Sequence, residues 1–154
     1  MLIEQINPDL FKIPLPIGAV YPHLIWKTDL PSNRFSDDWE VIFAPMKRFI
    51  DLCIDPSIKM IDPAEGWNTD KREEYIKGQS PEDYSMSMPR IGFSQRDLRV
   101  STFMGLLGKT KSVWSVGFVN GRHRTRIAEY LGAEFIPVQV NKSEANALKK
   151  HLGI

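Results

Sequence analysis

The spacing of the prolines constrains this chain most strongly. Ten of its eleven prolines lie at or before Pro89, at intervals too short to leave room for long helices. Proline lacks a backbone N–H and breaks a helix interior, so the first half should consist of short elements. The expected elements are strands over residues 13–26 and 39–44, helices over residues 45–54 and 70–77, a loop over residues 78–87 and an extended segment over residues 88–93.

The second half shows a clearer pattern. Residues 112–119 alternate between polar and apolar side chains and end in apolar ones, which is typical of a strand. Apolar residues in 122–131 have helical spacing, and residues 135–140 are typical of a strand. Gly132 stands where a helix-terminating glycine belongs, and the short link after it predicts a return to a parallel strand. The order of strand, helix and strand therefore predicts a mixed α/β (α+β) fold with a C-terminal βαβ unit.

A length of 154 residues fits one domain with one core. We expect a Pro-rich region of short elements over residues 1–69, a central segment over residues 70–142, and a C-terminal helix over residues 143–154, capped by Ser143. The single cysteine, Cys53, lies in an apolar segment, which indicates a buried thiol in a reducing cytoplasm. The chain shows neither an apolar run long enough to span a membrane nor an export-signal pattern, so we expect a cytoplasmic protein.

The net charge of +1 hides an uneven distribution. Residues 90–126 carry eight Lys or Arg and one acid, a net charge of +7, while the remaining residues carry twelve basic and eighteen acidic side chains, a net charge of −6. Such a segregated charge favours one basic surface for nucleic acid on the same side as the arginines of residues 122–126. The alternative is that these charges are dispersed around the fold. The residues expected to bind DNA on this surface are Arg90, Arg96, Arg99, Lys109, Lys111 and Arg126.

A glycine turn with three arginines follows the strand over residues 112–119. Amides at a helix start lack partners and carry the positive end of the helix dipole, so phosphate is the natural ligand there. The expected phosphate- and nucleotide-binding residues are Asn120, Gly121, Arg122, His123, Arg124 and Thr125. The alternative is a solvated basic helix start with a core histidine.

Helical spacing divides the residues after the turn between two faces. Ile127, Tyr130 and Leu131 should mark the core side, with His123 and Arg124 nearest the sheet edge. The residues expected to face outward are Arg122, Thr125, Arg126 and Glu129.

Phosphodiester or phosphoanhydride cleavage requires charge stabilisation and an activated water. Arg122 and Arg124 can supply the charge, His123 is the best local base, and Mg²⁺ is the expected helper. The sequence does not identify a carboxylate that would hold the metal, and Glu129 is as well placed to pair with Arg126. Hence the metal ligands stay unassigned.

Residues 120–140 read NGRHRTRIAEYLGAEFIPVQV. This stretch resembles the ParB/sulfiredoxin superfamily, in which a strand, a Gly-x-x-Arg turn, a helix and a return strand carry the phosphate site; Gly121 and Arg124 match that signature. Sulfiredoxins carry Gly-Cys-His-Arg, but Arg122 stands at the position of their nucleophile, so sulfinic acid repair is excluded. Met88-Pro89 and the Asn-Gly-Arg-His-Arg turn are more similar to plasmid fertility-inhibition (Osa-like) proteins, over residues 70–142.

This resemblance implies a plasmid-encoded protein that suppresses conjugal or T-DNA transfer, with ATPase and DNase activity at the turn. The implied ligands and partners are ATP, Mg²⁺ and DNA, together with a conjugative coupling protein. The alternative is a non-catalytic inhibitor that uses the same basic face to occupy DNA or to block the coupling protein.

Overall fold

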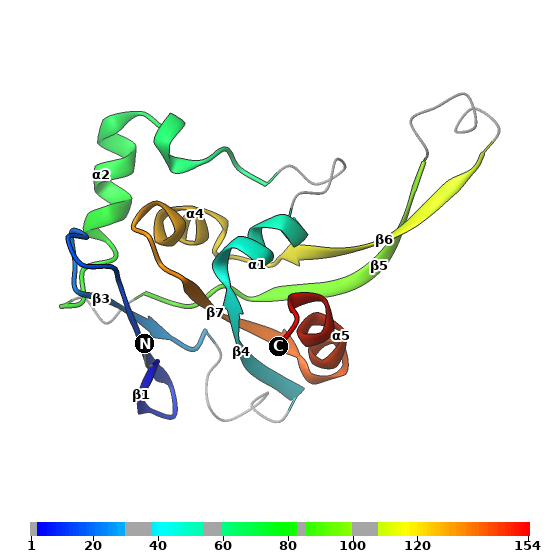
Figure 1. Ribbon diagram of the computed structural model, residues 1–154, viewed down its shortest axis with the longest axis horizontal. Helices are drawn as coiled ribbons and strands as arrows, with labels where there is room; N and C mark the ends of the chain where they lie inside the picture. Colours follow the sequence, from blue (N-terminus) through cyan, green and yellow to red (C-terminus); the bar gives the residue numbers. More distant parts are fainter. Residues whose placement is uncertain (1–2, 30–37, 54–59, 83–85, 100–107) are drawn as a thin grey trace.

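The computed structural model describes residues 3–29, 38–53, 60–82, 86–99 and 108–154, which form short strands and short helices (Figure 1). The strands are β1 (Glu4–Asn7), β2 (Leu10–Pro14), β3 (His23–Lys27), β4 (Trp39–Pro45), β5 (Ile91–Arg99), β6 (Thr110–Phe118) and β7 (Phe135–Asn141). The helices are α1 (Met46–Cys53), the 3₁₀ turn η2 (Ala64–Gly66), α2 (Thr69–Lys77), α4 (Arg122–Tyr130) and α5 (Lys142–Leu152). The predicted mixed α/β fold is confirmed.

The first sheet is the antiparallel meander β1-β2-β3. The prediction of one strand over residues 13–26 is wrong, because this range contains the end of β2, a turn and most of β3. Pro16 and Gly18 lie in that turn, and Gly18 has φ of 91°, which no strand residue adopts. The Leu15 amide closes the turn by donating to the Pro22 carbonyl at 3.0 Å.

β7 follows α4 as expected, but its pairing differs from the prediction. β7 forms an antiparallel ladder with β4, from Trp39 opposite Asn141 to Pro45 opposite Phe135. Its parallel contact is a single bridge between Gln139 and Arg90, where the Gln139 amide donates to the Pro89 carbonyl at 2.8 Å. The return strand is therefore not the parallel partner that the short link predicted.

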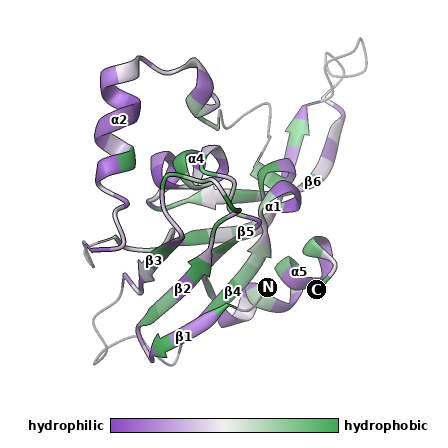
Figure 2. Ribbon diagram, turned by 60° about the vertical axis from the view of Figure 1, so that its left-hand side comes forward, coloured by the Kyte–Doolittle hydropathy of each residue, from purple (hydrophilic) through white to green (hydrophobic). Residues whose placement is uncertain are grey.

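One core joins the N-terminal sheet, β4, β7 and the helices. Its largest fully buried side chains include Trp26, Phe49, Phe93, Ile127 and Leu148. Cys53 is buried as predicted, and burial raises the pKa of its thiol to about 12, so it is inert at neutral pH. α2 differs from the other helices, since none of its residues is buried and it is largely hydrophilic (Figure 2).

The helix end predicted from Gly132 is confirmed. Gly132 adopts a positive φ just after Leu131, the C-cap of α4, and Gly153 adopts a positive φ as the C-cap of α5. The cap of α5 is Asn141 rather than Ser143, because the Asn141 side chain accepts a hydrogen bond from the Ser143 amide at 3.0 Å. In the described part of the chain, no helix is long and apolar enough to cross a membrane.

Candidate functional site: the start of helix α4

Gly121 forms the turn between β6 and α4. Its φ is 88°, and a Cβ atom at this position would lie 2.8 Å from Pro89 Cα and 2.9 Å from Pro89 Cβ. Only glycine fits both the backbone conformation and this close approach. The turn is further held by the amide of Val119, which donates to the Arg90 carbonyl at 2.9 Å. Pro89 and Arg90 therefore fix the position of the helix start.

Asn120 supports this turn instead of facing a ligand. Its Oδ1 accepts from the Arg90 amide at 2.9 Å, and its Nδ2 donates to Asp29 Oδ2 at 2.5 Å. Asp29 also lies 3.9 Å from the Arg90 guanidinium. Because both ends of the Asn120 amide are engaged by the fold, the prediction that this side chain binds phosphate is not supported.

Thr125 and Arg126 were expected to face outward, and this expectation is wrong. Thr125 is fully buried, and its hydroxyl donates to the Gly121 carbonyl at 2.9 Å. Arg126 is 7% exposed; its Nε donates to the Ile61 carbonyl at 2.9 Å, and its Nη1 lies 2.7 Å from Glu129 Oε2. Neither side chain is available to phosphate or DNA. The predicted pairing of Arg126 with Glu129 is confirmed.

Arg124 lies half-buried at the side of α4 that faces α2. Its Nη1 donates to the Ser87 carbonyl, and its own carbonyl accepts from Gln79 Nε2 at 3.2 Å. Burial lowers the pKa of Arg124, and the neighbouring Asp29 and Tyr75 partly offset this effect. An arginine guanidinium stays protonated in proteins, so this group remains a cation next to the helix start.

His123 lies in an aromatic cluster with Tyr75 and Trp67. Its ring stacks on Tyr75 at 5.1 Å with an interplanar angle of 13°, and it meets Trp67 edge-on at 5.5 Å. Burial, followed by the positive charges of Lys71 and Arg122, lowers the pKa of His123. The imidazole is therefore neutral at pH 7, which a general base requires, although its two faces are not both open to solvent.

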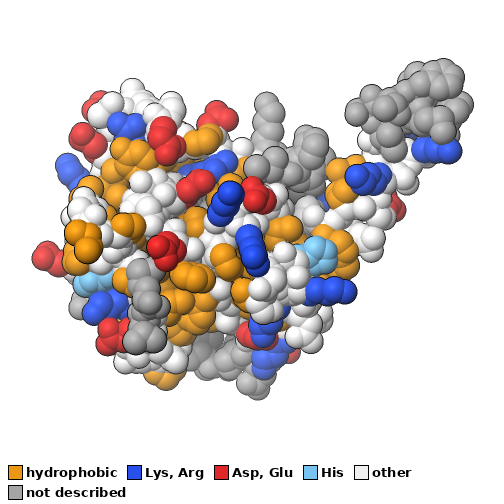
Figure 3. All heavy atoms as spheres, in the orientation of Figure 1, with side chains coloured by type: hydrophobic (Ala, Val, Ile, Leu, Met, Phe, Trp, Pro, Cys, Tyr) orange, Lys and Arg blue, Asp and Glu red, His pale blue; other side chains and the backbone are white. Residues whose placement is uncertain are grey.

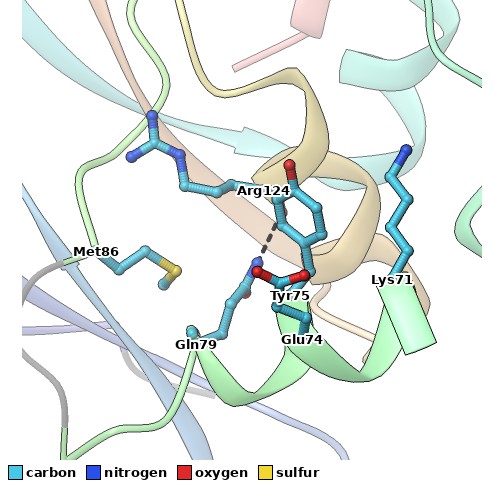
Figure 4. A pocket seen from close by; sticks show the side chains of 7 residues that line it. Lys71, Glu74, Tyr75, Gln79, Met86 and Arg124 are labelled. Carbon is cyan, nitrogen blue, oxygen red and sulfur yellow. Dashed lines mark hydrogen bonds between the residues drawn. The ribbon is translucent and has the colours of Figure 1, made fainter.

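A pocket of ≈ 650 Å³ opens between α2 and the start of α4 (Figure 4). This volume is within the range of small-molecule sites. Lys71 and Arg124 line the pocket from two different helices, with their side chains directed to opposite sides of Tyr75, and Lys71 Nζ lies 4.8 Å from the centre of the Trp67 ring. The complete lining consists of Lys71, Glu74, Tyr75, Gly78, Gln79, Met86 and Arg124.

Most of these residues were missed in the sequence. Lys71, Glu74, Tyr75 and Gly78 have i, i+3, i+4, i+7 spacing and so share one face of α2 and its end. This spacing could have identified the face, but a face with a cation, an acid and an aromatic residue lacks the apolar pattern by which a packed helix face is recognised in a sequence. Of the predicted site residues, Arg124 lines the pocket, and Arg122 and His123 lie on the same first turn of α4.

The remaining predicted DNA-binding residues do not share one face with this turn. Arg90 lies beside it, in contact with Asp29 and 5.8 Å from the Trp39 ring. Arg96, Arg99 and Lys111 lie farther along the β5–β6 hairpin, which projects from the body of the molecule (Figure 1). Arg99 is eight residues beyond the hairpin root at Ile91, which is about 26 Å along a strand. The expectation of one continuous basic side is therefore wrong.

Metal ligands were left unassigned by the sequence. In the described ranges, no group of three or more His, Cys, Asp or Glu residues could hold a metal ion. Glu74 is the carboxylate that lines the pocket. Mg²⁺ is commonly bound by one or two carboxylates together with substrate phosphates, so these residues fit an ion that arrives with a nucleotide rather than an all-protein site.

Two comparisons with known proteins relate this chain to plasmid proteins. Residues 41–153 match the family model described as plasmid fertility inhibition factor. The fold is similar to the crystal structure of the oncogenic suppression activity protein, described as a plasmid fertility inhibition factor and determined as a gold(I) cyanide derivative, with a TM-score of 0.61 and 14% identity over 98% of this chain and 74% of that one. No curated protein matches the sequence.

Proposed function

The chain belongs to the plasmid fertility inhibition factor family, and we propose that it suppresses conjugal or T-DNA transfer by binding ATP or a DNA phosphate at the start of α4 and hydrolysing it. The observation that carries this proposal is that Lys71 and Arg124, from two helices, line one pocket beside the helix start. Two cations from separate helices, next to unpaired helix amides, form a site that favours an anion.

The chemistry of the pocket supports a nucleotide in particular. Lys71 and Arg124 would bind phosphate oxygens, and the positive charge of Arg122 lies close enough to lower the pKa of His123. Mg²⁺ bound with the nucleotide would neutralise phosphate charge as it develops. Within this arrangement, neutral His123 is the group that would accept a proton from the attacking water.

The second candidate function is inhibition without turnover, by occupation of DNA or of a coupling protein. Two contacts favour it: the Arg124 guanidinium donates to the Ser87 carbonyl, and the His123 ring stacks on Tyr75. Both side chains are thus partly engaged by the fold, which suits binding better than proton transfer. The two candidates differ in turnover and agree on phosphate binding.

The test measures ATP binding, ATP hydrolysis and DNA nicking with Mg²⁺ present. We expect Lys71→Ala to weaken ATP binding about ten- to hundredfold, since a charge-assisted contact contributes roughly 1.5–3 kcal/mol. Lys77→Ala is the matched control, because Lys77 is an exposed lysine of the same helix outside the pocket. Equal effects of the two substitutions would refute the site. Wild-type ATP binding without any hydrolysis or nicking would favour the non-catalytic candidate.

A further inference from the structure

Asn120 and Gly121 form the one Asn-Gly pair of the sequence. In such a pair the backbone nitrogen of the glycine can attack the side-chain carbonyl carbon of the asparagine, because glycine has no Cβ to hinder the approach. The attack closes a succinimide ring and expels ammonia. Water then opens the ring and leaves an aspartate or an isoaspartate. The pair at the start of α4 is therefore a candidate site of spontaneous deamidation.

The backbone N–H of Gly121 is available for this reaction. In the described part of the chain, no backbone hydrogen bond engages this N–H, which precedes the first residue of α4. Gly121 is also partly exposed, so water and hydroxide can reach the turn. An N–H without an acceptor can give its proton to hydroxide, and the deprotonated nitrogen is the nucleophile. The turn thus leaves the attacking atom free.

The Asn120 side chain, in contrast, is held at both ends. Its Oδ1 accepts from the Arg90 amide at 2.9 Å, and its Nδ2 donates to Asp29 Oδ2 at 2.5 Å. Ring closure makes the planar amide tetrahedral and releases Nδ2 as ammonia, so the hydrogen bond to Asp29 must break. The Asp29 carboxylate also opposes the negative charge that the attacking nitrogen brings to the amide. Asp29 therefore slows the reaction while the turn is folded.

The product of deamidation does not fit the turn. Acidic and basic side chains are interspersed over the face of the molecule shown in Figure 3. At the turn, a carboxylate on residue 120 would lie beside Asp29 in place of the Nδ2 donor, and the two acids would share Arg90. Isoaspartate would also lengthen the backbone next to Gly121, where a Cβ atom would already lie 2.8 Å from Pro89 Cα. Deamidation would therefore weaken the attachment of the start of α4.

We propose that Asn120 is a deamidation site, that Asp29 suppresses its reaction in the folded protein, and that the product destabilises the turn. The overall change replaces the side-chain amide with a carboxyl group, consumes one water molecule and releases one ammonia molecule. The reaction needs neither an enzyme nor a bound nucleotide. The proposal therefore does not depend on the function of the α4 site.

The experiment incubates the protein at mildly alkaline pH and measures the deamidated fraction at each asparagine by peptide-mapping mass spectrometry. In the urea-unfolded wild type we expect Asn120 to react ahead of the other asparagines, and Gly121→Ala to slow it. In the folded protein, Asp29→Ala should speed the reaction at Asn120 about ten- to hundredfold, the increase in the open fraction that loss of one charge-assisted hydrogen bond produces. Asp29→Asn keeps an acceptor and should have a smaller effect.

Leu148→Ala is the matched control, because it removes a fully buried side chain of α5 and lowers the stability of the whole fold. It should leave the rate at Asn120 in the folded protein within about threefold of the wild type, since the turn opens locally. Equal acceleration by Leu148→Ala and Asp29→Ala overturns the proposal, because the reaction then proceeds through global unfolding. Faster reaction at another asparagine of the unfolded chain, or an unchanged urea midpoint of the deamidated protein, also overturns it.

Discussion

Gly121→Ala tests whether the contact with Pro89 fixes the turn at the start of α4. An alanine at φ of 88° costs about 1–2 kcal/mol for the left-handed backbone. Its Cβ would also lie 2.8 Å from Pro89 Cα, which is backbone and cannot rotate away, and overpacking of this kind costs about 1–3 kcal/mol. The expected loss in the free energy of unfolding is therefore about 2–5 kcal/mol.

Gly18→Ala is the matched control for this substitution. Gly18 has a nearly equal φ of 91°, but a Cβ there would meet nothing within 4 Å. It should lose only the backbone contribution, about 1–2 kcal/mol. Urea unfolding of both variants, analysed at constant m-value, gives the two free energies. If Gly121→Ala costs no more than Gly18→Ala, the packing against Pro89 does not restrict the turn and the reasoning fails.

Three further predictions concern side chains around this turn. Arg126→Met should reduce the free energy of unfolding by about 1–3 kcal/mol through loss of its two polar contacts, while duplex binding stays unchanged; weaker DNA binding at full stability would contradict its structural role. His123→Phe keeps an aromatic ring but removes a group whose pKa is lowered on folding. As pH drops, the unfolded state therefore takes up the proton before the folded state does. Urea unfolding should show the stability of the wild type falling more steeply than that of the variant as pH drops below 6.5. Parallel stability curves of the two proteins would contradict the lowered pKa of His123. Asn120→Asp places a carboxylate beside Asp29 and should lower the free energy of unfolding more than Asn120→Ala does at neutral pH, with a smaller difference in acid. Urea unfolding of both variants at neutral and at acidic pH measures the two losses. Equal losses of the two variants at both pH values would show that the hydrogen bond from the Asn120 amide to Asp29 does not contribute.

The helix start was predictable because its signals are local. A glycine after an alternating strand, followed by helical spacing, predicts a turn and a helix, and α4 begins at Arg122 as expected. The contact between Gly121 and Pro89 was not predictable, since it joins positions 32 residues apart. The meander of β1 to β3 was predictable only in part, because the strand predicted over residues 13–26 includes residues 15–22, where the chain turns.

The faces of α4 were assigned wrongly for a physical reason. Helical spacing assigns residues to an inner and an outer face only where a helix packs on one side and is solvated on the other, as an amphipathic surface helix does. In the structure the Ile61 carbonyl and the η2 turn cover the supposed outer face, where they enclose Arg126. The buried arginine keeps its charge because Glu129 and a carbonyl satisfy it, and a sequence alone does not reveal such a partner.

The charge count indicated a basic region but not its shape. Residues 90–126 include both the α4 turn and the hairpin, so one sum combined two separate elements. The direction in which a hairpin leaves a sheet depends on what packs at its root, here α5 against Phe93 and Trp114. These contacts link residues from distant parts of the chain, so the separation of the β5–β6 hairpin from the α4 turn required the structure.

The structure divides the polar side chains around the turn into those that maintain it and those that remain open to a ligand. Asn120, Thr125 and Arg126 direct their polar atoms into the fold. Lys71 and Arg124 line the pocket from two helices, and α2, none of whose residues is fully buried, packs against the core through the partly buried side chains of Tyr75 and Ile76. An anion bound in this pocket would thus stabilise the packing of α2 on α4, and its binding would be thermodynamically coupled to the order of α2.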